Sequence, residues 1–365
     1  MHSEGSCSTI KTIMSKLGEG KRLIKLVAVL VAEAMALLLS SCGNSERQQE
    51  IEYISGKYNV PEEKQLIVYT SHKEEVYLPI IREFENRTGI WVEIHAGGTA
   101  EMFSEVRSAA EEGRCDIMFG GGIESYEAGK DLFLPYSVSE KNILDPGFVD
   151  NDNYWTAFTE LPIVFVYNKK LVSYSEAPKT WKELLSSKWK GQIAFADMNN
   201  SGTSYTIIST MEQVLDKDAK EILPRFYDQL GGRVLASSGQ VIPKVADGDF
   251  LIGITLEETA RKAMGQGEDI AMIYPEDGTS AVPDGCAMVK NAPHSYNAGR
   301  FIDFIVGYDT QQYAVENFYR RSVRTDLDYP YTGTLDQIDF DVKRSAKEEK
   351  DVFALWDQLE NKGGQ

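Results

Sequence analysis

The chain has 365 residues, of which 42% are hydrophobic, and this is enough apolar material to bury the cores of two lobes. It carries 56 acidic against 38 basic residues, a formal net charge of -18, which argues against the basic patches that nucleic-acid binding requires. Four cysteines are too few for a scaffold built on disulfides.

The N-terminal segment has the form of a secretory signal. Residues 21–42, KRLIKLVAVLVAEAMALLLSSC, place basic residues before an apolar stretch that is too short for a reliable membrane span. Leu39-Ser40-Ser41-Cys42 resembles the lipobox of bacterial lipoproteins. We therefore expect a signal peptide over residues 1–41 and a lipidated Cys42 at the start of a polar, flexible linker over residues 42–65. The expected location is the outer face of a bacterial cell membrane, or the periplasm.

Strand-like and helix-like patterns alternate from residue 66 onward. Apolar runs at 66–71, 91–98 and 115–122 are separated by amphipathic patterns at 74–89 and 102–113. This β-α-β-α-β succession predicts a parallel sheet with helices packed on it. Ligands of open α/β sheets bind just beyond the carboxyl ends of the strands. The candidate ligand contacts at these ends are Thr70, Ser71, Gly98, Thr99, Gly121 and Gly122.

The same alternation restarts after residue 160. Strand-like runs begin at residues 161, 192, 250, 269 and 286, with helical patterns between and after them. We expect two α/β lobes with a ligand cleft between them, residues 66–160 plus 272–310 in the first and 161–271 plus 311–365 in the second. The sequence leaves open whether Cys115 and Cys286 pair, and because they lie in different strand-like runs we expect them to be separate.

Residues 196–207, ADMNNSGTSYTI, place amides, a glycine and hydroxyls directly before an apolar helical run. The start of a helix leaves several backbone N–H groups unpaired and carries about half a positive charge. The run is therefore either an ordinary N-cap or an anion site, and the residues concerned are Ser201, Gly202, Thr203 and Ser204.

Several segments together resemble the substrate-binding lipoproteins of bacterial ABC importers, in the branch shared by binders of ferric iron and binders of hexose phosphates and phosphonates. The resemblance covers residues 66–330. It implies the two-lobed α/β periplasmic-binding-protein type II fold, a monomer that uses no cofactor, and an ABC permease in the membrane as partner. The segments that carry it are LIVYTSHKEE (66–75), CDIMFGGG (115–122), LPIVFVYNKKLV (161–172), APKTWKELLSSKWKGQIAFAD (177–197), NNSGTSYT (199–206) and RRSVRTD (320–326).

The resemblance to iron binders implies a histidine after the first strand and adjacent tyrosines in a turn after a strand of the second lobe. His72 meets the first requirement, but Glu257 and Glu258 stand in the place of the tyrosines. Carboxylates are oxygen ligands that a hard ferric ion accepts, so His72, Glu257 and Glu258 are the alternative iron ligands. Glutamates at this place, together with YPEDGTS at 274–280, look more like the organophosphate branch.

The expected ligand is asymmetrical, with one anionic end and one end that bears hydroxyls or an amine. The helix start at residue 201 would hold the anionic end, helped by hydroxyls of Thr70 and Ser71 and by His72 as a cation. Carboxylates at the other end would accept hydrogen bonds and repel a second phosphate. The residues assigned to that end are Glu257, Glu258, Asp277 and Thr279.

The sequence-based hypothesis is therefore capture of an organophosphate, such as a hexose phosphate, a phosphoglycerate or an aminoalkyl phosphonate, by closure of the lobes. The alternatives are a ferric-iron-binding protein of an ABC importer and a ligand sensor for a receptor kinase. A hydrolase using Ser201 or Ser204 as nucleophile is disfavoured, because the run lacks the Gly-x-Ser-x-Gly elbow and no HExxH or Cys/His set accompanies it.

Overall fold

The computed structural model describes residues 60–330 and 335–363. The predicted signal peptide, Cys42 and the linker up to residue 59 lie outside the described residues. Residues Glu62–Gln365 form one compact unit, within which the secondary structure gathers around two sheets. In the part of the chain that is described, no helix is both long enough and apolar enough to cross a membrane.

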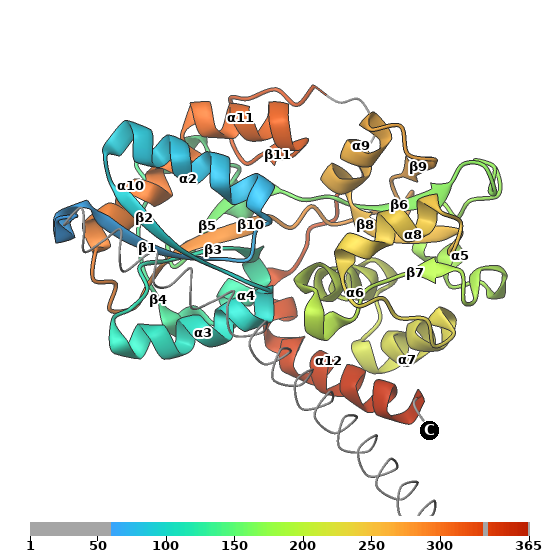
Figure 1. Cartoon of the computed structure of the whole chain (residues 1–365). Coiled ribbons are helices and arrows are strands. Elements are labelled where there is room, and N and C mark those ends of the chain that lie inside the picture. Colours follow the sequence, from blue (N-terminus) through green and yellow to red (C-terminus); the bar gives the residue numbers. More distant parts are fainter. Residues whose placement is uncertain (1–59, 331–334, 364–365) are drawn as a thin grey trace, which may run out of the picture. The chain divides into compact units, whose positions relative to one another are not determined.

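The first lobe is built on a mixed sheet with the strand order β11-β5-β10-β3-β1-β2, and β4 pairs with β10 (Figure 1). Strand β1 pairs in parallel with β2 and β3, as the sequence predicts, whereas β10 pairs antiparallel with β3 and β5. The strands are β1 (Gln65–Thr70), β2 (Trp91–Ala96), β3 (Ile117–Gly122), β4 (Phe133–Leu134), β5 (Thr156–Glu160), β10 (Asp284–Val289) and β11 (Arg321–Ser322).

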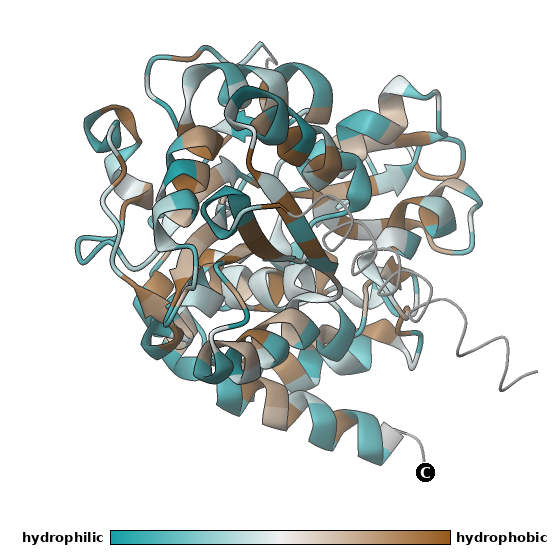
Figure 2. Cartoon of the chain, turned by 60° about the vertical axis from the view of Figure 1, so that its left-hand side comes forward, coloured by the Kyte–Doolittle hydropathy of each residue, from teal (hydrophilic) through white to brown (hydrophobic). Residues whose placement is uncertain are grey.

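Amphipathic helices cover this sheet. In α2, Val76, Ile80, Ile81 and Phe84 follow the helical spacing and are all buried, and the helix ends at Gly89, whose φ of 65° provides the left-handed turn. Figure 2 shows brown strand segments in the middle of the molecule, surrounded by helices that carry both teal and brown segments. The helices of this lobe are α2 (Glu74–Thr88), α3 (Thr99–Glu112), α4 (Ile123–Ala128), α10 (Ser295–Val306) and α11 (Tyr308–Phe318).

The second lobe is built on a smaller sheet with the order β7-β8-β6-β9. Every residue of β6 is buried, because alternate side chains enter two different cores. Ile163 and Phe165 pack into one core, and Val164 and Val166 into the other. The strands are β6 (Ile163–Asn168), β7 (Ile193–Ala194), β8 (Ile252–Leu256) and β9 (Ile270–Ile273), and the helices are α5 (Trp181–Leu184), α6 (Gly202–Leu215), α7 (Ala219–Leu230), α8 (Val241–Ala246) and α9 (Glu257–Gly265).

The last helix, α12 (Val342–Gly363), contacts both lobes. Its Val352 and Trp356 are buried in the core of the second lobe, while the helix also packs along α4 of the first. Figure 1 shows it running below α4 and beside α7.

The C-terminal part of the chain divides between the lobes differently from the prediction. Residues 311–365 were all expected in the second lobe, but α11 and β11 belong to the first, because β11 pairs with β5 and α11 packs on both strands. Residues 272 and 273 were expected in the first lobe, yet they end β9, which pairs with β6 in the second sheet. Cys115 and Cys286 are buried and free, so the expectation that they are separate is confirmed.

Candidate functional site

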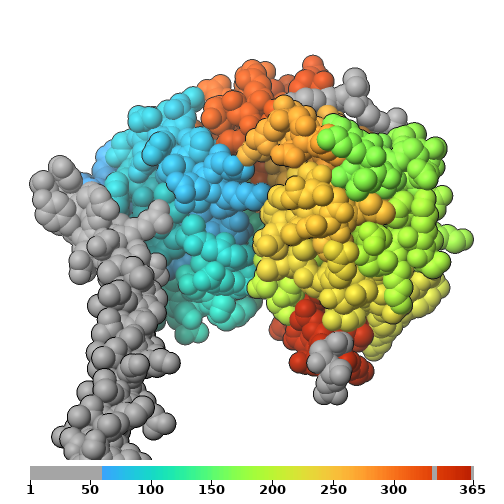
Figure 3. All heavy atoms as spheres, turned by 45° about the vertical axis from the view of Figure 1, so that its right-hand side comes forward, coloured from blue at the N-terminus to red at the C-terminus, as the bar shows by residue number. Residues whose placement is uncertain are grey.

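A cavity of about 360 Å³ lies between the two lobes, along the line where the blue and cyan half meets the yellow and green half in Figure 3. The carboxyl ends of β1 and β3 and the turn after β2 form its wall on the first lobe. The start of α6 and the junction of β8 with α9 form its wall on the second. The predicted residues that line it are Ser71, His72, Gly98, Thr99, Gly121 and Gly122 from the first lobe, and Ser201, Gly202, Thr203 and Glu258 from the second.

The start of α6 faces the first lobe across this cavity. Ser201 has an extended backbone and caps the helix, because its Oγ accepts a hydrogen bond of 3.3 Å from the backbone N–H of Ser204. Gly202 lies so close to the first lobe that an added Cβ would be 3.0 Å from Oγ1 of Thr99. Ser201 is therefore an N-cap, which was one of the two roles considered from the sequence, and the first turn of the helix lines the cavity.

Two glycines shape the opposite wall at the end of β3. Gly120 and Gly121 have φ values of 105° and 86°, which L side chains rarely adopt. A Cβ on Gly121 would also lie 2.9 Å from the methyl group of Thr99. Only glycine therefore allows this strand end to turn so close to α3.

Arg320 is a buried cation that lines the cavity, together with Lys73, and it was not assigned from the sequence. Arg320 is only 6% exposed. Its Nη1 donates hydrogen bonds to Oγ1 of Thr159, at 2.8 Å, and to the carboxylate of Asp284. Its Nε has no hydrogen-bond partner among the described residues. Arg320 and Arg321 are neighbours, and successive side chains of an extended chain point to opposite faces, so only Arg320 lines the cavity.

His72 lies beside this ion pair but is neutral, which corrects its predicted role as a cation. Its Nε2 is 3.4 Å from Oδ2 of Asp284, and its ring packs against Phe119 and Phe158. Burial lowers the pKa of His72 to about 4, and the attraction of Asp284 does not compensate because Arg320 already pairs with that carboxylate.

The side chain of Glu257 points away from the cavity, contrary to the prediction. It is 1% exposed, and its carboxylate accepts hydrogen bonds from Nε of Arg321 at 2.7 Å, from Nε of Arg261 at 2.9 Å and from the hydroxyl of Tyr274. Burial acts to raise the pKa of Glu257, but the bonds from Arg321 and Tyr274 hold it below the usual range. Because Arg321 belongs to the first sheet and Glu257 to α9, this ionic cluster links the lobes.

Four other predicted residues have structural roles and do not line the cavity. Thr70 is fully buried and its Oγ1 accepts from the backbone N–H of His72 at 3.2 Å, while Ser204 is enclosed by the cap of α6. The carboxylate of Asp277 accepts from the backbone N–H of Trp181, at the start of α5. Thr279 is fully buried and donates to the carbonyl of Ile163 at 2.8 Å.

The fold and the cleft together define the two-lobed fold of type II periplasmic binding proteins. The chain shares this fold with the periplasmic binding protein AfuA from Actinobacillus pleuropneumoniae, solved with exogenous fructose 6-phosphate bound. The TM-score is 0.74 at 22% sequence identity, over 81% of this chain and 98% of that chain.

The chain belongs to the bacterial extracellular solute-binding proteins, the family whose profile matches residues 127–357. It is 27% identical to Iron uptake protein A1 of Synechocystis sp., over 78% of this chain and 81% of the relative. It is 20% identical to a putative 2-aminoethylphosphonate-binding periplasmic protein of Salmonella typhi, over 67% of this chain and 73% of the relative. It is therefore a solute-binding protein of the ABC-importer type, a class that binds small ligands and interacts with a membrane permease.

Proposed function

We propose that this protein captures a phosphorylated small molecule in the cleft and delivers it to an ABC permease. The observation that supports this most is Arg320, a buried arginine that lines the same cavity as the start of α6 and whose Nε has no hydrogen-bond partner among the described residues. A helix N-terminus with a nearby guanidinium provides N–H donors and positive charge for an anion. The acidic surface of the protein otherwise repels such a ligand.

Acidic and hydroxyl groups also line the cavity: Glu258, Thr259 and Ser238 on the second lobe, and Glu75 on α2 of the first. These groups accept hydrogen bonds from sugar hydroxyls or pair with an amine. They therefore favour a ligand with a single anionic group, such as a hexose phosphate or an aminoalkyl phosphonate. A ligand contacts its full set of donors only when both lobes meet, which drives closure.

Ferric iron is the second candidate, favoured by the similarity to Iron uptake protein A1. The ligand set predicted for it does not converge, because Glu257 is engaged by two arginines and only His72 and Glu258 line the cavity. Among the described residues there is no group of three or more His, Cys, Asp and Glu side chains placed to hold a metal ion. The geometry therefore favours the organophosphate over iron.

Native mass spectrometry of a soluble form that begins after Cys42, purified from rich medium, tests this proposal. We expect a retained adduct with the mass of a phosphorylated metabolite, displaced by added fructose 6-phosphate or 2-aminoethylphosphonate. An adduct with the mass of iron, unaffected by these compounds, would show that the ligand class is wrong.

The close approach of Gly202 to Thr99 leads to a further prediction. Replacing Gly202 with valine places methyl groups where only 3.0 Å separates its Cβ position from Thr99, so the lobes cannot close fully. We expect the affinity for fructose 6-phosphate, measured by titration calorimetry, to fall more than about tenfold, while the urea midpoint of unfolding stays unchanged. Adding Thr99→Ala to this variant should restore part of the affinity. If Gly202→Val alone bound with wild-type affinity, the close approach of Gly202 to Thr99 would not limit closure of the lobes.

A further inference from the structure

The carboxyl group of Glu124 lies buried at the contact between the lobes, below the ligand cavity. Glu124 follows β3 on α4 and is 1% exposed. Its Oε1 is hydrogen-bonded at 2.6 Å to Oγ1 of Thr206, which belongs to α6 in the second lobe. Its Oε2 is buried and has no partner among the described residues. Thr206 and the nearby Gly122 both line the cavity, so the contact forms part of its floor.

The hydrogen bonds around Glu124 fit its neutral form better than its ionised form. The Thr206 hydroxyl has one proton but two acceptors within reach, Oε1 of Glu124 and the carbonyl of Gly202 at 3.2 Å. A protonated Glu124 donates to Thr206, which then donates to Gly202, and every proton is used. Burial raises the pKa of Glu124 to about 7, against the smaller opposing effect of the bond from Thr206.

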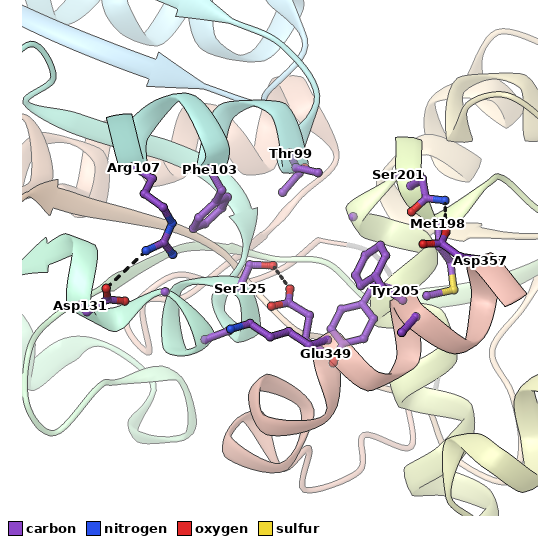
Figure 4. Close-up of a pocket in the computed structure, with 18 residues that line it drawn as sticks. Thr99, Phe103, Arg107, Ser125, Asp131, Met198, Ser201, Tyr205, Glu349 and Asp357 are labelled. Atoms are coloured by element: carbon purple, nitrogen blue, oxygen red, sulfur yellow. Dashed lines mark hydrogen bonds and ion pairs between the residues drawn. The ribbon is translucent and has the colours of Figure 1, made fainter. Parts of the chain in front are cut away.

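The groups packed around Glu124 act in the same direction. The carboxyl group facing it is that of Glu349 of α12, which accepts from Oγ of Ser125 at 3.3 Å (Figure 4) and whose own pKa is raised by burial. When Glu349 is ionised, its negative charge further opposes ionisation of Glu124. Tyr205 of α6 is the other titratable neighbour, and burial raises its pKa, so it stays neutral. No lysine or arginine of the described residues is hydrogen-bonded to Glu124.

We propose that Glu124 takes up a proton when the lobes close, so that ligand capture by this protein is coupled to pH. The inference rests on lobe closure around a solute, and it adds regulation of the same site to the proposed function. Separation of α4 from α6 breaks the bond to Thr206 and admits water, and the carboxyl group then regains its ordinary acidity. There is therefore a pH range in which the carboxyl group of Glu124 is ionised in the open form and protonated in the closed form.

The direction of the effect follows from proton linkage. The pKa is about 7 in the closed form and near the ordinary 4.5 in the open form, so acid favours closure between these values. The additional stability that protonation gives the closed form is fully present below about pH 4.5 and is lost as the pH rises through 7. Between pH 6 and pH 8, the closure equilibrium of the wild type should weaken about tenfold.

The test compares wild type with Glu124→Gln, which keeps the shape of the neutral acid and cannot titrate. Titration calorimetry with fructose 6-phosphate in buffers of different ionisation enthalpy gives the number of protons taken up on binding. We expect the wild type at pH 6.5 to take up most of one proton more than Glu124→Gln. The protonation of the probe itself cancels in this difference.

Glu212→Gln is the matched control. Glu212 is also a buried glutamate, its pKa is raised to about 7, and its Oε1 has no hydrogen-bond partner in the described part of the chain. It lies on α6 beside Glu348 and Arg344 of α12, however, and not between α4 and α6. Its replacement should leave the proton count at the wild-type value. Equal proton counts in the wild type and Glu124→Gln would overturn the proposal.

A ligand-free measurement separates this inference from the proposed ligand class. Spin labels on Glu105→Cys of α3 and Lys220→Cys of α7, both exposed positions, report the distance between the lobes by double electron–electron resonance. We expect the short-distance fraction to decrease from pH 6 to pH 8 in the wild type and to stay constant with Glu124→Gln. If fructose 6-phosphate gives no heat with any variant, the ligand class fails while this pH response still decides the proton coupling. An identical pH response of the short-distance fraction in the wild type and in Glu124→Gln would overturn the proposed proton coupling.

Discussion

The double variant Arg320→Met with Asp284→Asn is expected to bind fructose 6-phosphate roughly a hundredfold more weakly than the wild type, as measured by titration calorimetry. The variant removes an arginine that lines the cavity and, with it, the charge-assisted hydrogen bonds that we propose it donates to the anion. Both members of the buried ion pair are neutralised together, because Arg320→Met alone would leave the 2% exposed Asp284 as an uncompensated charge.

Arg324→Met is the matched control for this variant. The Arg324 side chain is also buried, at 3% exposure, but it pairs with Glu140 and Asp326 and does not line the cavity. It should retain wild-type affinity. Wild-type affinity in the Arg320 and Asp284 double variant, with folding confirmed by urea unfolding, would show that the guanidinium does not contact the ligand.

Replacing Glu257 with alanine is expected to lower the free energy of unfolding by roughly 3–5 kcal/mol. The change leaves Arg321 and Arg261 facing each other at the contact between β11 and α9 without the carboxylate that now holds both. Urea unfolding followed by circular dichroism measures the loss as a lower midpoint. Because Arg321 is attached to the first sheet and Glu257 to the second lobe, we also expect a wider distribution of lobe distances.

Glu258→Ala provides the control one residue along the same helix. Glu258 is partly exposed, lines the cavity and accepts a hydrogen bond from the neighbouring Thr259. Its loss should shift the urea midpoint little and should instead change the preference between fructose 6-phosphate and 2-aminoethylphosphonate. Equal stability losses in the two variants would contradict the separation of roles.

The local part of this architecture could be predicted from the sequence. The periodic runs around β1, β2 and β3 were identified because hydrophobic spacing and strand-ending glycines are properties of neighbouring residues. The hydroxyl-rich start of α6 was identified for the same reason, and its first turn does line the cavity. Strand β5 was missed, because TAFTE is short and its hydroxyl groups are buried only by tertiary contacts.

The charges of the site could not be assigned in this way. Arg320 and Asp284 are 36 residues apart in the sequence, and they meet only because β10 lies between β5 and β3 in the sheet. Glu257 and Glu258 look alike in sequence, yet the pitch of α9 directs one to two arginines and the other to the cavity. The neutrality of His72 likewise depends on burial, which sequence spacing does not reveal.

The position of β10 has a consequence for the order in which the protein folds. This strand is internal to the first sheet, between β5 and β3, although it is synthesised after the whole sheet of the second lobe. After β5, more than a hundred residues must be synthesised before β10 can take its internal place in the first sheet. All strands of the second sheet, by contrast, have been synthesised once β9 is complete. Because closing so long a loop is entropically costly, we expect the sheet of the second lobe to form before the first sheet is complete, and we expect β1, β2 and β3 to need a chaperone until β10 has been synthesised. The core of the second lobe is completed last, when Val352 and Trp356 of α12 pack into it.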